Sequence, residues 1–142
     1  MAQKLTALQP IAGMNYIYNV SAHVGCRRKC PNNPDDVQLV QFFIREIVPR
    51  FYESQIIPEL PRLTGQIDGV TAFYIYDIQR MGGASMEVDG IVSPARGLVY
   101  AGSHPWLISV LNFKYKSFFP DLYDKIPFHP ELRPTLRASL AA

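Results

Sequence analysis

The sequence predicts a mainly α fold, a small module of three helices with a short N-terminal β segment and an extended, proline-rich C-terminal tail. Three observations support this prediction. Apolar residues recur at spacings of three and four in three segments, as they do on one face of an amphipathic helix. Residues 14–25 alternate apolar and polar positions, which favours a strand. Prolines crowd the end of the chain, at positions 120, 127, 130 and 134.

The first predicted helix covers residues 33–48. Its start combines a capping residue, a first-turn proline and two acidic side chains that complement the helix dipole, Asn33, Pro34, Asp35 and Asp36. Pro49 is expected to end this helix because proline lacks the backbone N–H that a helix interior needs. Residues 49–66 are then expected to form an irregular connection.

The second predicted helix follows the turn Asp68-Gly69 and ends at Gly82-Gly83, a pair suited to the left-handed conformation of a helix end. A short strand over residues 73–76 is the alternative, because aromatic and β-branched side chains favour strands. Asp89-Gly90 repeats the Asp-Gly pair 21 residues later and predicts a second tight turn. The third predicted helix is opened by Ser103-His104-Pro105 and ends before Pro120.

One domain with two appendages fits a chain of 142 residues. We expect an N-terminal arm or strand over residues 1–19, a helical domain over 20–116 and an extended strap over 117–142. Fourteen Lys and Arg residues against twelve Asp and Glu give a formal charge of +2, which is too balanced for phosphate-driven binding of nucleic acid. No run reaches the roughly 18 apolar residues of a membrane span, and no signal peptide is seen, so synthesis in the cytoplasm is expected.

The order of short motifs carries a family resemblance. A helix of the form DVQLVQ is followed by Gln66-Ile67-Asp68-Gly69, by the aromatic helix over residues 72–80 and by Val88-Asp89-Gly90. This order resembles the peptidoglycan-binding-like superfamily of three-helix modules over roughly residues 20–112. Similar modules accompany bacterial cell-wall hydrolases, phage lysis and tail proteins, and contractile secretion effectors.

The resemblance implies a non-catalytic binding module of a bacterial or phage cell-envelope-associated system. Its partner would be peptidoglycan, and it would act at the cell wall, in a virion or in a secretion assembly. The alternative is a structural subunit of a phage particle or contractile injection assembly, in which the same fold packs against protein partners or other copies of itself. Low charge and many aromatic residues favour this alternative.

Five side chains are predicted to form a face for a sugar or peptide, because aromatic rings stack on apolar sugar faces while amide and guanidinium groups add directional bonds. They are Tyr74, Tyr76, Gln79, Arg80 and Trp106. Burial in the core or in an interface is the alternative for these residues, and Trp106 lies on the apolar stripe of its predicted helix.

No cofactor, metal or catalytic residue is predicted. His23, Cys26 and Cys30 have a spacing that zinc ligands use, but a fourth ligand is lacking nearby, so free thiols or a disulfide are favoured. Asp68, Glu87 and Asp89 are conceivable acid–base carboxylates. Each aspartate precedes a glycine, however, and turn formation explains that position without chemistry.

Overall fold

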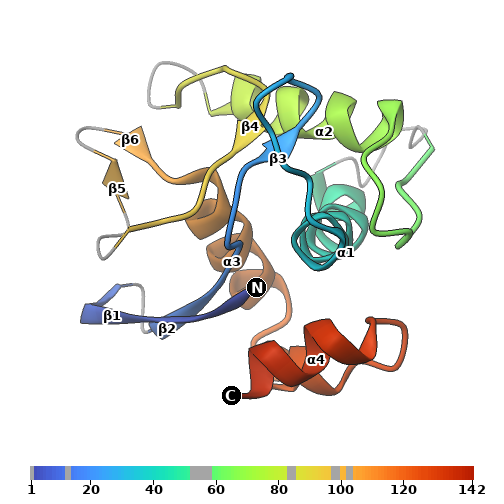
Figure 1. The fold of residues 1–142 in the computed structure, drawn as a ribbon. Coiled ribbons are helices and arrows are strands. Elements are labelled where there is room, and N and C mark those ends of the chain that lie inside the picture. The colour runs from blue at the N-terminus through green and yellow to red at the C-terminus, as the bar shows by residue number, and fades with distance from the viewer. Residues whose placement is uncertain (1, 12–13, 52–58, 83–85, 97–99, 102–103) are drawn as a thin grey trace.

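The computed structural model describes residues 2–11, 14–51, 59–82, 86–96, 100–101 and 104–142. Within these ranges the chain is mixed α/β (Figure 1). The helices are α1 (Pro34–Phe51), α2 (Gly69–Met81), α3 (Leu107–Phe118), the 3₁₀ helix η2 (Tyr123–Phe128) and α4 (Pro134–Ala141). The strands are β1 (Gln3–Ile11), β2 (Met14–Asn19), β3 (Val24–Gly25), β4 (Ile91–Val92), β5 (Tyr100–Ala101) and β6 (His104–Pro105).

The prediction of a mainly α, three-helix module is therefore wrong. The three predicted helices are present as α1, α2 and α3, but the described residues also form three two-stranded sheets. β1 and β2 form an antiparallel ribbon, and the short pairs β3–β4 and β5–β6 are also antiparallel. Pairs of two residues leave no alternating pattern in the sequence, because such a pattern needs at least four residues to be recognised.

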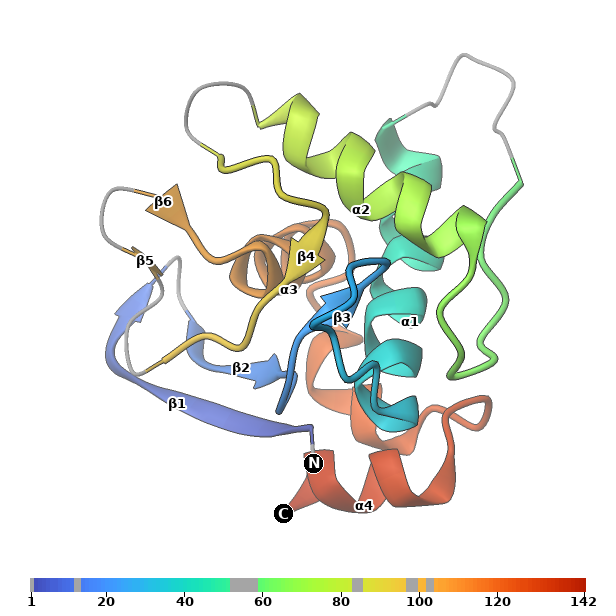
Figure 2. The same cartoon turned by 45° about the horizontal axis from the view of Figure 1, so that its top comes forward.

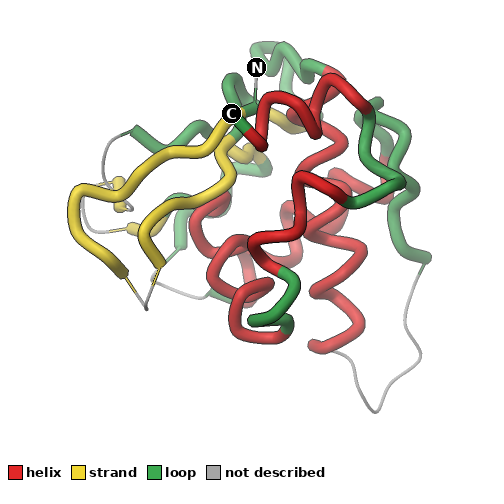
Figure 3. The backbone as a smooth tube through the Cα atoms, turned by 90° about the horizontal axis from the view of Figure 1, so that it is seen from below, coloured by secondary structure: helices red, strands yellow, loops and turns green. Residues whose placement is uncertain are grey.

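The C-terminal tail is not extended, which also corrects the prediction. It folds into η2 and α4, and α4 lies against β1, η2 and α1 (Figure 3). Leu136 and Leu140 lie one turn apart on α4, and Leu132 lies four positions earlier in the bend before the helix; all three are buried. Pro134 is at the start of α4, where a missing N–H costs nothing.

Helix α1 is the centre of the molecule (Figure 2). It contacts α2, α3, α4 and β3, and most of its circumference is apolar and fully buried, at Val37, Leu39, Val40, Phe42, Phe43, Ile44, Ile47 and Val48. The predicted boundary at Pro49 is wrong, since the helix continues to Phe51. A helix that is covered on nearly all sides derives its stability from packing, and here packing outweighs the lost hydrogen bond of one proline.

Helix α2 covers the predicted segment, but the backbone conformations and contacts at its two ends differ from the prediction. Asp68 is its N-cap, and the carboxylate accepts a hydrogen bond from the Thr71 N–H at 2.7 Å. Gly82 adopts the right-handed conformation, with φ of −69°, so the predicted left-handed end is wrong at this residue, while Gly83 lies outside the described residues. A Cβ on Gly82 would lie 2.7 Å from the Cβ of Met86, so glycine is required there for close approach of the chain.

Helix α3 begins at Leu107, after the predicted opening at Ser103-His104-Pro105, and ends before Pro120 as expected. Trp106 is its N-cap and makes no side-chain capping bond. The predicted opening residue Ser103 lies outside the described residues, and His104 and Pro105 belong to β6. Among the described helices, none is both long enough and apolar enough to cross a lipid bilayer.

Candidate functional site

A small pocket lies where α2, β4 and the start of α3 meet. Its volume is about 70 Å³, which is room for a few water molecules or one small polar group. Its wall mixes apolar and polar side chains, Gln79, Met86, Glu87, Asp89, Ile91, Ser93, Pro105, Trp106 and Leu107. Two of the five predicted ligand residues therefore line one pocket, although Gln79 is on α2 and Trp106 is the N-cap of α3.

Gln79 is buried, and its amide is occupied by the turn that follows α2. The side-chain Nε2 donates to Asp89 Oδ1 at 2.9 Å and to the Ile91 carbonyl at 3.2 Å. The side-chain oxygen accepts from the Gly90 N–H at 2.8 Å. Gln79 thus holds the turn Asp89-Gly90 in the pocket wall, and its hydrogen-bonding groups are already used by the protein.

Trp106 contributes a half-buried indole to the same wall. Its Nε1–H is buried and has no hydrogen-bond partner among the described residues. Buried donors in proteins nearly always find an acceptor, so a donor without one calls for a functional explanation. Trp106 therefore offers a buried hydrogen-bond donor that is free for a ligand as far as the described residues are concerned.

The other three predicted ligand residues do not line this pocket. Tyr74 is 1% exposed and packs in the core, where burial raises the pKa of its phenol. Tyr76 is 43% exposed, and the Arg80 guanidinium lies 5.9 Å from the centre of its ring. Arg80 also pairs with Asp77 at 3.1 Å. The five residues are consequently distributed over the core, the pocket and an exposed side of α2.

The three carboxylates that were considered as acid–base groups and set aside lie in two different parts of the structure. Asp68 caps α2 and is not part of the pocket wall. Glu87 and Asp89 both line the pocket. Asp89 Oδ1 accepts from Gln79 and from the Ile91 N–H at 2.9 Å, so this oxygen stabilises the turn. Glu87 is exposed and forms no ion pair within the described part of the chain.

The cysteine loop lies beside the pocket because β3 pairs with β4, with Val24 opposite Val92 and Gly25 opposite Ile91. Cys26 and Cys30 are free thiols, and burial raises the pKa of the Cys30 thiol. His23 Nδ1 lies 3.0 Å from the hydroxyl oxygen of Ser93, a pocket residue. In the described ranges, no group of three His, Cys, Asp or Glu side chains is arranged to hold a metal ion.

No protein-family model, curated protein or solved structure matches this chain. The function must therefore be argued from the pocket itself. Sequence reasoning did not single out Ser93, Met86 or Ile91 as pocket residues. The sequence feature that could have identified them is their closeness to Asp89-Gly90, because this turn contributes to the pocket wall.

Proposed function

We propose that the chain is a non-catalytic binding module of a bacterial or phage cell-envelope-associated system, and that its pocket holds a small polar group of peptidoglycan. The observation that supports this proposal is the buried Trp106 Nε1–H, which lacks a partner among the described residues. A buried donor without an acceptor costs about 1–3 kcal/mol. A carbonyl or hydroxyl oxygen of a ligand removes that cost, and peptidoglycan carries both kinds of oxygen in its sugars and peptides.

The composition of the pocket wall agrees with such a ligand. Trp106, Ile91 and Leu107 provide apolar surface, while Glu87, Ser93 and Asp89 provide polar atoms at the same wall. Binding sites for small molecules combine these two kinds of surface, because apolar contact supplies affinity and a few polar groups fix orientation. The order of short sequence motifs is the reason for naming peptidoglycan as the ligand, although the three-helix fold that it implied is not the fold observed. On this proposal the chain acts at the cell wall, in a virion or in a secretion assembly.

The test is co-sedimentation with purified insoluble peptidoglycan. Trp106→Phe keeps an aromatic ring in the wall but removes the N–H. We expect about five- to tenfold weaker binding by this variant, which corresponds to about 1 kcal/mol for one hydrogen bond. Phe73→Ser is the control, since Phe73 is 49% exposed on α2 and does not line the pocket. Equal binding by native protein and Trp106→Phe would contradict the proposed site.

The alternative, a structural subunit of a phage particle or contractile injection assembly, has one observation in its favour. Phe73, Tyr76 and Met81 on α2 are each between 43% and 49% exposed, so this helix presents large apolar side chains to solvent. On the alternative, native chain does not sediment with peptidoglycan. Light scattering then gives a mass above that of one chain, and Phe73→Ser lowers this mass while Trp106→Phe does not.

A further inference from the structure

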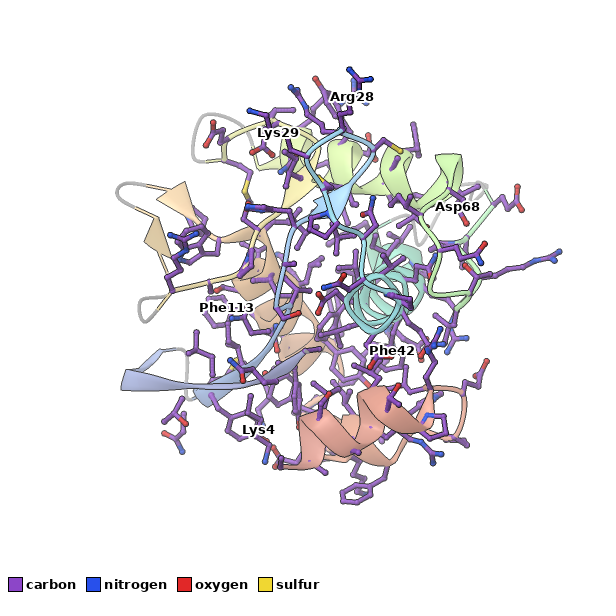
Figure 4. The ribbon with its side chains drawn as sticks, in the orientation of Figure 1. Lys4, Arg28, Lys29, Phe42, Asp68 and Phe113 are labelled. Atoms are coloured by element: carbon purple, nitrogen blue, oxygen red, sulfur yellow. The ribbon has the colours of Figure 1, made fainter. Side chains whose placement is uncertain are left out.

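A strongly cationic loop lies next to the pocket. Arg27, Arg28 and Lys29 are consecutive and exposed between β3 and α1. Arg28 and Lys29 lie at the tip of the molecule with their side chains directed away from it (Figure 4). The ion pairs of the described residues involve other cations, Arg45, Arg80 and Arg133. The three charges of the loop are therefore available to a partner.

This loop is held in place by hydrogen bonds. The Asn32 side chain bridges the backbone of Gly25, accepting from its N–H and donating to its carbonyl, each at 2.8 Å. A turn bond joins the Cys30 N–H to the Arg27 carbonyl at 3.0 Å. Arg27 Nε donates to the carbonyl of Asp89 at 2.9 Å. Because Asp89 lines the pocket, the last bond fixes the cationic loop directly beside the pocket wall.

Two surfaces of opposite charge thus adjoin each other, and no ion pair joins them within the described part of the chain. Arg27 contacts the backbone carbonyl of Asp89, and no guanidinium or ammonium group of the described residues lies within 4.0 Å of the carboxylates of Glu87 and Asp89. Charges more than 4.0 Å apart still attract each other. The cations of the loop and the carboxylates of the pocket nevertheless remain able to form charge-assisted hydrogen bonds with a ligand. A ligand with one cationic and one anionic group satisfies both surfaces at once.

We propose that the pocket and the cationic loop together select a short peptide that carries a free ammonium group and a free carboxylate. The ammonium group binds beside Glu87 and Asp89, and the carboxylate binds Arg28 and Lys29. This inference rests on the proposed function, because the cross-linking peptide of peptidoglycan has both groups. It adds that the peptide, and not the sugar chain, determines specificity.

Trp106 provides the readout, since it is the single tryptophan of the chain and lines the pocket. Its fluorescence is titrated with three soluble probes: a peptidoglycan disaccharide that carries its peptide, the same compound with the peptide amine acetylated, and the disaccharide without peptide. We expect acetylation to weaken binding about tenfold and removal of the peptide to weaken it further. Salt at about 0.5 M should weaken only the first probe strongly, because exposed charges are screened.

A matched pair of variants tests the loop. Arg28→Ala/Lys29→Ala lowers the net charge by two and should weaken binding of the peptide probe about tenfold. Arg62→Ala/Lys125→Ala lowers the net charge equally at two exposed cations outside the loop and should leave binding unchanged. Glu87 forms no ion pair with any described residue, and Glu87→Gln should remove the difference in affinity between the probe with a free amine and the acetylated probe.

The outcomes separate this inference from the proposed function. If insoluble peptidoglycan binds through Trp106 but the disaccharide alone binds as tightly as the peptide probe, the inference is overturned and the proposed function stands. Equal effects of the two double variants, or no fluorescence change with any soluble probe, overturn it as well. If insoluble peptidoglycan is not bound at all, both the inference and the proposed function fail.

Discussion

Two buried glutamines hold two loops in the same way. Gln41 accepts a hydrogen bond from the Gly65 N–H and donates to the Gln66 carbonyl, both at 2.9 Å. Gln79 accepts from the Gly90 N–H and donates to the carbonyl of the next residue, Ile91. Both glycines have positive φ, +75° at Gly65 and +74° at Gly90. In each turn, one side-chain amide thus pairs with the N–H of the glycine and with the carbonyl of the next residue. This explains why an uncharged amide is buried at both places.

The two Asp-Gly pairs differ, although the sequence predicts a tight turn at each. Asp68 is a helix N-cap and Gly69 is the first residue of α2, whereas Asp89 and Gly90 form a turn with a left-handed glycine. The structural counterpart of Gly90 is Gly65, which shares its conformation and its glutamine contact. A dipeptide pattern does not separate a cap from a turn, because aspartate accepts backbone hydrogen bonds in both.

Exchanging each glycine for alanine tests this distinction. Gly90→Ala should lower the free energy of unfolding by about 1–2 kcal/mol, because an L-residue is strained at positive φ, and its Cβ would lie 3.2 Å from the Tyr76 ring. Gly69→Ala meets no atom within 4 Å and should be neutral or stabilising by up to about 1 kcal/mol. Urea unfolding of both variants gives the two values. Equal losses of unfolding free energy in Gly90→Ala and Gly69→Ala would contradict the different roles of the two Asp-Gly pairs.

At the scale of elements, α4 was not predicted although its leucine spacing is visible in the sequence. Four prolines near the C-terminus favour an extended tail, yet two of them lie within or at the start of helices, Pro127 in η2 and Pro134 in α4. The four-residue spacing of Leu132, Leu136 and Leu140 was present in the sequence. The helix itself contains only two of these leucines, Leu136 and Leu140, so the apolar period is short, and docking on α1 and β1 is what makes the helix stable.

Leu136→Ala should therefore destabilise the whole protein, not only its C-terminus. The side chain is fully buried, and replacing a buried leucine by alanine costs about 2–5 kcal/mol through lost transfer energy and an unfilled cavity. Ala138→Ser on the exposed side of α4 is the control and should change the unfolding free energy by less than about 0.5 kcal/mol. Denaturant unfolding is followed by circular dichroism. A loss for Leu136→Ala as small as that of the control would show that α4 is not part of the core.

At the scale of the molecule, a polar network joins segments that are far apart in the chain. Asn112 on α3 accepts from the Tyr18 N–H at 2.8 Å and donates to the Tyr18 carbonyl at 2.9 Å. The Tyr123 hydroxyl of η2 donates to the side-chain oxygen of Asn112 at 2.5 Å, and the Tyr18 hydroxyl donates to the Tyr123 carbonyl at 3.3 Å. Strand β2, helix α3 and helix η2 therefore share one buried network around a single core.

The buried tyrosines predict that stability falls at alkaline pH. Burial raises the phenol pKa of Tyr18, Tyr123 and Tyr115 above the ordinary value of 10.0, to about 12 for Tyr115. The unfolded chain then loses phenol protons that the folded chain keeps, so the stabilisation is complete below pH 10 and declines above it. The slope is about 1.4 kcal/mol per pH unit for each such tyrosine.

Thermal unfolding measured from pH 7 to 11.5 checks this. Tm should fall above about pH 10, where free tyrosine ionises, and Tyr115→Phe should make the fall less steep, because it removes one buried phenol. A Tm that is the same at pH 8 and pH 11 would contradict the prediction.

The sequence by itself located helices α1 and α2 and singled out Trp106 and Gln79 as candidates for a site, whereas the role of Asp68 as a helix cap came from the structure. These features depend on helical periodicity and capping, which involve residues within a few positions of each other. Only the tertiary structure decided that Gln79 is occupied by a turn, that the Trp106 N–H lacks a partner and that α4 joins the core. It also placed the cationic loop beside the pocket, through the pairing of β3 with β4. Contacts between such distant segments result from packing of the whole chain, and no local pattern in the sequence encodes them.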